Sequence, residues 1–207
     1  MTRTMIRAIA IALYAAAGLG ACASAPPERF YTLSSPARAQ AADDPLAPTV
    51  VVAPAAVPEL VDRPQLVTIT GANQVAILEQ QRWAEPLRLA IARVVAEDLG
   101  RQLGGARVST RDEALRSPDC RVYLDVRRFE ARRAAAVDLE ALWTVACAGG
   151  VRVTGRSVAR EPIHDAGTDA IVVAQGRALR VVARDVGQAL RANVRLSDAA
   201  LTARAGR

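Results

Sequence analysis

Two neighbouring segments of the chain alternate between apolar and polar residues, and this pattern predicts an antiparallel β-hairpin. The segments are Cys120–Phe129 and Asp138–Cys147, with the turn centred between Arg133 and Ala134. The register gives apolar pairs on one face and polar pairs on the other: Val122 with Val145, Leu124 with Trp143 and Val126 with Ala141, then Tyr123 with Thr144 and Arg127 with Glu140. One buried face fixes the register, so the hairpin must lie in a sheet that covers a core.

The same register places Cys120 directly opposite Cys147. Opposed strand residues lie about 4.5–5.5 Å apart, which a disulfide can span. We expect the bond to form in an oxidising compartment and to contribute roughly 3 kcal/mol of stability; two buried free thiols are the alternative. After Cys147, Gly149 and Gly150 are expected to turn the chain into a third strand at Val151–Val158, which completes a meander.

The rest of the chain predicts an α+β fold, in which a mixed, mostly antiparallel sheet has two main helices packed on one face. Helical spacing of apolar residues indicates one helix from Pro86 to the Gly104–Gly105 pair and another that begins near Thr168. Four further strands are expected: Arg29–Leu33, Thr49–Ala53, Gln65–Thr70 and Gln74–Glu79. The predicted organisation is a single domain over residues 29–200, with a mobile loop at 34–48 and a C-terminal tail at 201–207.

The first residues have the layout of a secretory signal. Arg3 and Arg7 supply a basic start, residues 8–17 are apolar, and small residues follow. The apolar stretch is shorter than the roughly 20 residues of a membrane span. Because no charge occurs between Arg7 and Glu28, an uncleaved anchor is the alternative. The pattern predicts a signal peptide over residues 1–21.

The motif Leu-Gly-Ala-Cys that ends at Cys22 resembles the lipobox of bacterial lipoproteins. The resemblance implies that the Cys22 thiol carries a diacylglycerol and becomes the new N-terminus. Residues 22–28 would then form a short, lipid-anchored tether. An aspartate directly after the cysteine would resemble the signal for retention in the inner membrane. Ala23 and Ser24 follow the cysteine instead, and the missing aspartate favours transfer to the outer membrane. Several acyl chains give stable anchoring where a single chain is marginal.

The residue types required for catalysis or metal binding do not come together in the sequence. The 207-residue chain has one histidine, His164, and it has no Cys-x-x-Cys pair, nucleophile elbow or phosphate-binding glycine loop. We therefore predict no catalytic residue, no metal site and no cofactor beyond the covalent lipid on Cys22. All 27 basic residues are arginines, and they form no dense patch with interleaved aromatics, which argues against nucleic-acid binding.

Several segments together resemble the PqiC-type (paraquat-inducible protein C) auxiliary lipoproteins of ABC-type transport systems. They are Phe30–Ser34, Val57–Val67 with its Asp-Arg-Pro-Gln, Gly71–Asn73, Arg82–Leu87 with its Arg-Trp-Ala-Glu-Pro-Leu, Tyr123–Phe129 and Leu142–Trp143. The resemblance implies a non-enzymatic outer-membrane lipoprotein on the periplasmic face. Its implied partner is an MCE-domain (mammalian cell entry) protein of an inner-membrane complex that transports phospholipid and maintains membrane integrity.

Three residues in these motifs are candidates for partner binding: Arg63, Arg82 and Trp83. A structural role is the alternative for each, with Arg63 paired to Glu59 or Glu85 and Trp83 covering the sheet. Two other functions stay open for the whole chain. The alternatives to the docking role are a lipid carrier that holds an acyl chain itself, and a structural envelope lipoprotein that binds peptidoglycan or another envelope protein. Self-association into a homo-oligomer is also plausible for a receptor of a tubular partner.

Overall fold

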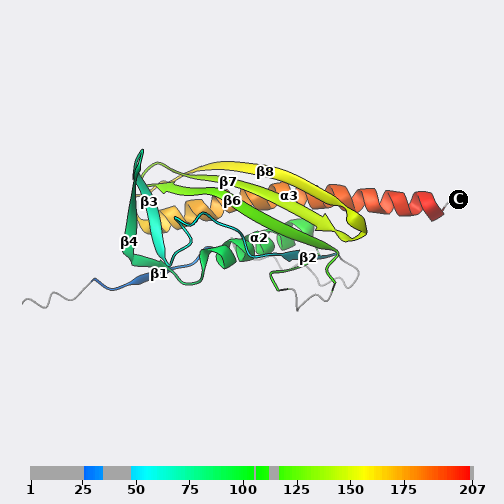
Figure 1. Cartoon of the computed structure of the whole chain (residues 1–207), viewed down its shortest axis with the longest axis horizontal. Coiled ribbons are helices and arrows are strands. Elements are labelled where there is room, and N and C mark those ends of the chain that lie inside the picture. The colour runs from blue at the N-terminus through cyan, green and yellow to red at the C-terminus, as the bar shows by residue number, and fades with distance from the viewer. Residues whose placement is uncertain (1–25, 35–47, 105, 112–116, 206–207) are drawn as a thin grey trace, which may run out of the picture.

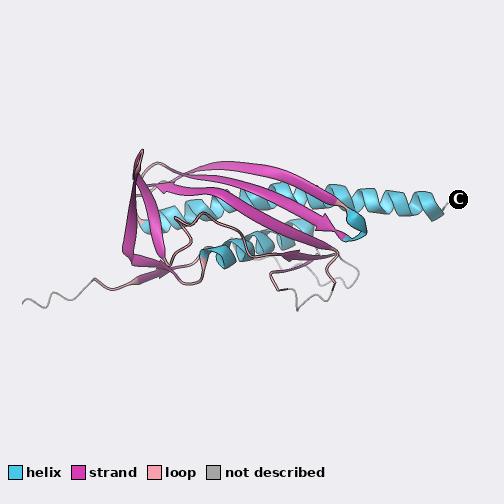
Figure 2. Cartoon of the chain, viewed as in Figure 1, coloured by secondary structure: helices cyan, strands magenta, loops and turns pink. Residues whose placement is uncertain are grey.

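The computed structural model describes residues 26–34, 48–104, 106–111 and 117–205. They form an eight-stranded sheet and two long helices, as Figures 1 and 2 show, which confirms the predicted α+β class. The helices are α2 (Leu87–Leu103) and α3 (Thr168–Ala205), and Ala148–Gly150 forms a short 3-10 turn. The strands are β1 (Arg29–Tyr31), β2 (Thr49–Val52), β3 (Gln65–Gly71), β4 (Gln74–Trp83), β5 (Arg107–Ser109), β6 (Cys120–Arg132), β7 (Ala136–Cys147) and β8 (Arg152–Pro162).

The sheet mixes local hairpins with long-range parallel pairs. Antiparallel pairing joins β3 to β4, β6 to β7 and β7 to β8, so the predicted meander is confirmed. Parallel pairing joins β1 to β4, β2 to both β5 and β6, and β3 to β6. Strand β6 therefore links the meander to the rest of the sheet, with the β3–β4 hairpin at its Arg132 end and the disulfide at its Cys120 end.

The predicted register of β6 and β7 is confirmed from Cys120 to Val126, and then it changes. The predicted pairing of Arg127 with Glu140 is wrong, because a β-bulge inserts one residue and places Arg128 opposite Glu140. Without the bulge, strict alternation would turn the Phe129 side chain out to solvent. With it, Phe129 lies in the core and is only 2% exposed. Burial of this aromatic side chain is the physical reason for the shift.

Both helices cover the same face of the sheet. Helix α2 buries the apolar residues predicted for its stripe, and Gly104 ends it in the left-handed conformation. On α3 the apolar residues at helical spacing that face the sheet are buried, namely Val172, Leu179, Val182, Val186 and Leu190. The helix continues to Ala205, past the predicted domain limit at 200, and most of the predicted loop at 34–48 lies outside the described residues.

A glycine on β8 makes room for the buried indole ring of Trp143. Gly155 on β8 lies opposite Trp143 on β7, and a Cβ atom at Gly155 would be 2.1 Å from the indole ring. The ring is held in place because its Nε1–H donates to Ser157 Oγ (3.0 Å), whose hydroxyl donates to Asp185 Oδ2 on α3 (2.7 Å). This chain of hydrogen bonds links the sheet to the helix across the core.

We expect Gly155→Ala to lower the free energy of unfolding by about 1–3 kcal/mol, because the new methyl overpacks a held indole ring. Denaturation monitored by circular dichroism measures the change. Gly100→Ala is the matched control, because Gly100 lies in α2 with its nearest neighbour at 3.9 Å. Alanine there should leave stability unchanged or raise it by up to about 1 kcal/mol. Equal effects of the two substitutions would contradict the steric explanation.

The opposite face of β6, β7 and β8 carries ion pairs instead of a second layer of helices. Its charged side chains pair along and across the strands: Arg127 with Asp125, Arg132 with Glu130 and Asp138, Arg160 with Asp138, and Arg156 with Glu140. The Arg156 guanidinium holds the pKa of Glu140 below its ordinary range. Exposed pairs of this kind contribute little stability each, so this face is a solvated surface.

Candidate functional site at the exit of the N-terminal segment

The N-terminal segment leaves the domain as part of the sheet. Strand β1 pairs in parallel with the last residues of β4, with Arg29 opposite Gln81 and Tyr31 opposite Trp83. The Ala84 N–H donates to the Tyr31 carbonyl at 2.8 Å, which extends this pairing by one residue. The point at which the chain leaves is therefore set by backbone hydrogen bonds.

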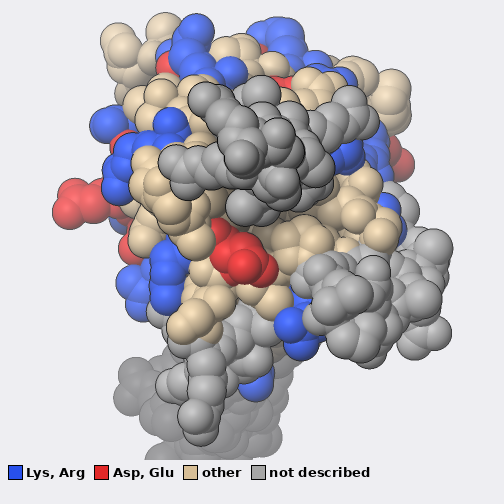
Figure 3. Space-filling model, turned by 90° about the vertical axis from the view of Figure 1, so that its right-hand side faces the viewer, with Lys and Arg blue, Asp and Glu red and all other residues tan. Residues whose placement is uncertain are grey.

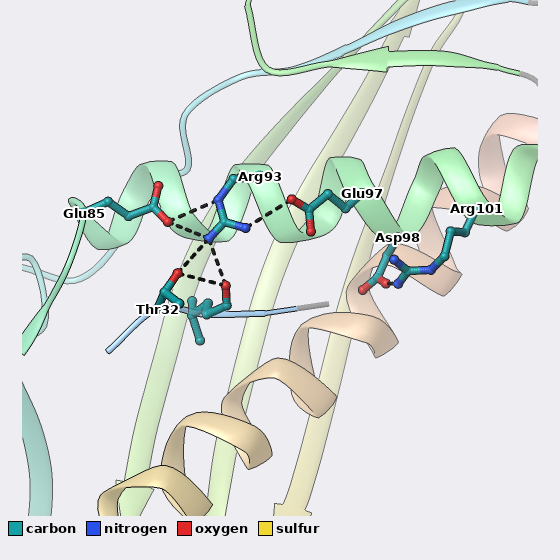
Figure 4. A network of polar contacts seen from close by, with 7 residues as sticks. Thr32, Glu85, Arg93, Glu97, Asp98 and Arg101 are labelled. Atoms are coloured by element: carbon teal, nitrogen blue, oxygen red, sulfur yellow. Dashed lines mark hydrogen bonds and ion pairs between the residues drawn. The ribbon is translucent and has the colours of Figure 1, made fainter. Parts of the chain in front are cut away.

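Arg93 of α2 binds the residues that follow β1 (Figure 4). Its Nη2 donates to the Leu33 carbonyl at 2.8 Å and to Thr32 Oγ1 at 3.2 Å. The same guanidinium donates from Nε to Glu85 Oε1 at 3.1 Å and from Nη1 to Glu97 Oε1 at 3.1 Å. The hydrogen bonds that Arg93 donates to Glu85 raise the pKa of Arg93 above its already high ordinary value, against the opposing effect of burial. Arg93 therefore stays charged and joins the segment to α2.

The second helix also contacts this segment. A Cβ atom at Gly176 of α3 would lie 3.0 Å from the Ser34 carbonyl oxygen, so the chain passes close to the helix backbone. Leu33 is fully buried in the core between these contacts. Residues 32–34 are thus held by α2 on one side and by α3 on the other.

The predicted partner-binding residues lie at this exit, where Arg82 has an ion pair and Trp83 lies in the core. Arg82 pairs with Glu28 of the predicted tether at 2.9 Å. Trp83 is 7% exposed, belongs to the core, and donates its backbone N–H to the Pro64 carbonyl at 2.7 Å. Arg63 stands one residue before Pro64, and its buried Nε has no hydrogen-bond partner among the described residues. Cys22 lies outside the described residues.

Sequence reasoning missed the central residue of the site. Glu85, a candidate partner of Arg63, pairs with Arg93 instead. The i,i+4 spacing of Arg93 and Glu97 is the only local signal of this network, and it predicts an exposed helix pair. The other acceptors of Arg93 are a backbone carbonyl and a hydroxyl about 60 residues away in the chain, which no local pattern indicates.

The disulfide lies at the other end of β6, and it joins Cys120 to Cys147. Beside it, the Asp119 carboxylate accepts hydrogen bonds from the backbone N–H (2.7 Å) and the hydroxyl (2.8 Å) of Thr49. These contacts tie the start of β2 to the start of β6. These hydrogen bonds lower the pKa of Asp119 below its ordinary value. The bond from the Thr49 backbone N–H has the larger effect and the bond from its hydroxyl the smaller one.

We expect Asp119→Asn to lower stability at neutral pH by roughly 1 kcal/mol, because the amide is a weaker acceptor than the carboxylate. Since the pKa of Asp119 is lower in the folded state, its contribution is complete above the ordinary aspartate pKa of about 3.9. It is lost as the pH falls through that value toward the lower folded pKa. The variant should therefore lose less stability than the parent between about pH 5 and pH 2. Asp62→Asn, at an exposed turn, is the charge-matched control.

The described part of the chain has neither a cluster of metal ligands nor a membrane-spanning helix. Within those ranges, no three His, Cys, Asp or Glu residues cluster as metal ligands would. His164 is exposed in the loop between β8 and α3. Over the same ranges, no helix has both the length and the apolar character that a membrane crossing requires.

The α+β fold of the chain is similar to that of proteins whose structures have been solved. One solved protein, from Xanthomonas campestris and assigned to the DUF330 family, matches with a TM-score of 0.65 and 18% identity over 82% of this chain and 99% of its own. Another, described as an uncharacterized protein, matches with a TM-score of 0.67 and 18% identity over 80% and 99% of the two chains. At this identity the likeness shows the fold alone.

The chain belongs to the family of ABC-type transport auxiliary lipoprotein components, whose sequence model matches residues 31–187. The predicted resemblance to the PqiC-type lipoproteins is thereby confirmed. The match includes the exit segment, α2 and most of α3, so the residues that hold the N-terminal segment lie inside the family domain. No curated protein matches the chain.

Proposed function

We propose that the protein is a non-catalytic docking component of an MCE-type phospholipid transport system, anchored by a lipid on Cys22 to the periplasmic face of the outer membrane. Membership of the transport auxiliary family supports the general role. The single observation that carries the proposal is the way the domain holds the chain at Tyr31–Ser34, a few residues after Cys22. Because the chain is fixed to the domain this close to the proposed lipid on Cys22, the domain stays at the membrane surface.

The candidate contact residues support a docking surface next to the anchor. Arg63 has a buried Nε without a hydrogen-bond partner in the described structure, and it adjoins Pro64, which binds the backbone of Trp83. An arginine guanidinium is suited to a carboxylate of a partner protein, to which it can bind through two parallel hydrogen bonds. Arg82, already paired with Glu28, and Trp83, already buried, support the surface and are less available to a partner.

The experiment is purification of the tagged full chain from membranes in mild detergent, followed by mass spectrometry. The mature chain is expected to begin at Cys22 with a covalent lipid, and an MCE-domain protein is expected to co-purify. Arg63→Ala should reduce the co-purified partner while leaving the lipid mass unchanged, and exposed Arg160→Ala is the matched control. A bare thiol at Cys22, or the absence of MCE protein from the preparation, would overturn the proposal.

A further inference from the structure

The β3–β4 hairpin carries an apolar face that is separate from the core. Two directly opposed pairs form it, Val67 with Ile77 and Ile69 with Val75, and we call these four residues the hairpin face. Val67 is buried at its base and Ile69 is half-buried, whereas Val75 and Ile77 are 39% and 38% exposed. None of the four belongs to the core cluster, to which the other side of the hairpin contributes Leu66. The hairpin is therefore apolar on both sides.

The hairpin face is also free of charge. Residues 66–78 include no Asp, Glu, Lys or Arg. The outer face of β6–β8 also exposes Tyr123, Leu142 and Val158, but it differs because charged side chains pair along it. The end of the molecule opposite the hairpin differs as well, because Figure 3 shows arginines spread over its described surface with acidic side chains among them. An uncharged apolar surface of this kind is suited to the boundary between lipid headgroups and acyl chains, where the apolar area that it buries supplies the binding free energy.

The chain leaves the domain at the same end (Figure 1). Strand β1 pairs with β4, the strand that carries Val75 and Ile77, and Glu28 is fixed to Arg82 of that strand. From Cys22 to Arg29 the chain takes seven steps, which span at most about 25 Å when extended. Phe30 on β1 adds a 63% exposed aromatic ring close to this exit. A lipid on Cys22 would hold the hairpin face within a short distance of the bilayer.

We propose that the hairpin face rests on the outer-membrane bilayer to which Cys22 is anchored, with Val75 and Ile77 in its headgroup region. The inference rests on the proposed function, because it requires the lipid on Cys22. It adds a second, noncovalent contact that fixes the orientation of the domain. The bilayer is favoured over a second copy of the chain as the occupant because the predicted anchor precedes β1, which pairs with the strand that carries Val75 and Ile77.

The test uses the full, lipidated chain in vesicles of phosphatidylethanolamine and phosphatidylglycerol. Ile77→Cys receives an environment-sensitive fluorophore, and Val158→Cys on β8, 58% exposed on the ion-paired face, is the matched control. Nitroxide-labelled phospholipids in the vesicles should quench the probe at 77 about two-fold or more and leave the probe at 158 unquenched. Matching melting curves of the labelled variants and the parent ensure that the fold is unchanged.

Three other results would overturn the inference, and they separate it from the proposed function. If the chain floats with the vesicles but the probe at 77 stays open to aqueous iodide, the anchor is right and the bilayer contact is wrong. If the probe is shielded from iodide without vesicles as protein concentration rises, a second copy covers the face. If the chain does not float and Cys22 has no lipid mass, the proposed function fails and this inference fails with it.

Discussion

Trp83→Ala is expected to lower the free energy of unfolding by about 3–5 kcal/mol, the range for truncation of a buried tryptophan. The Trp83 side chain is 7% exposed at the end of β4, where the strand pairs with β1. Removing the indole ring leaves a cavity under the exit of the N-terminal segment. Chemical denaturation monitored by circular dichroism measures the loss.

Two variants test whether the loss comes from burial of the ring. Trp83→Phe should recover much of the stability, because an aromatic ring still fills the site. Phe30→Ala removes an aromatic side chain that is 63% exposed on the neighbouring strand, so its effect should stay within about 0.5 kcal/mol. We expect Trp83→Ala to weaken partner docking only as far as it unfolds the domain. Unchanged melting together with lost partner binding would instead make Trp83 a binding residue.

Replacing both Cys120 and Cys147 with alanine is expected to cost about 3–4 kcal/mol. The bond joins residues 27 apart in the chain, and its loss frees that loop in the unfolded state. Cys120 is also buried, so the substitution removes packed atoms in addition to the link. Urea denaturation under non-reducing conditions gives the difference.

Cys22→Ser is the matched control for the loss of a cysteine, since Cys22 lies before the first strand. It should leave the stability of the detergent-solubilised chain unchanged. Adding dithiothreitol should destabilise the parent toward the double variant and leave the double variant unaffected. A parent that melts at the same temperature with and without reductant would contradict a structural role for the bond.

Local patterns in the sequence predicted the hairpins and helices well, because those elements depend on neighbouring residues. The alternation in Cys120–Val126 fixed the register with β7, and Gly104 marked the end of α2. The bulge at Arg127 could not be predicted, since it depends on the place that the folded core provides for Phe129. The insertion of β2 between β5 and β6 could not be predicted either, because parallel pairing joins segments far apart in the chain.

The candidate site was predicted only in part, for a related reason. Arg82 and Trp83 were selected from the family motifs, and the structure places both at the exit. Arg93 belongs to no such motif, and the acceptor that joins it to the exit segment is the carbonyl of Leu33. A backbone acceptor can belong to any residue type, so the sequence has no signature for it.

The grip on residues 31–34 determines how the molecule bears tension. In the proposed docking role, a pull on the domain away from a lipid on Cys22 would load the parallel β1–β4 hydrogen bonds and the Arg93 contacts at the same time. Hydrogen bonds that are loaded simultaneously must break together. Hydrogen bonds that are loaded one at a time break one after another. The short strand thus serves as the mechanical coupling between the anchor and the rest of the protein.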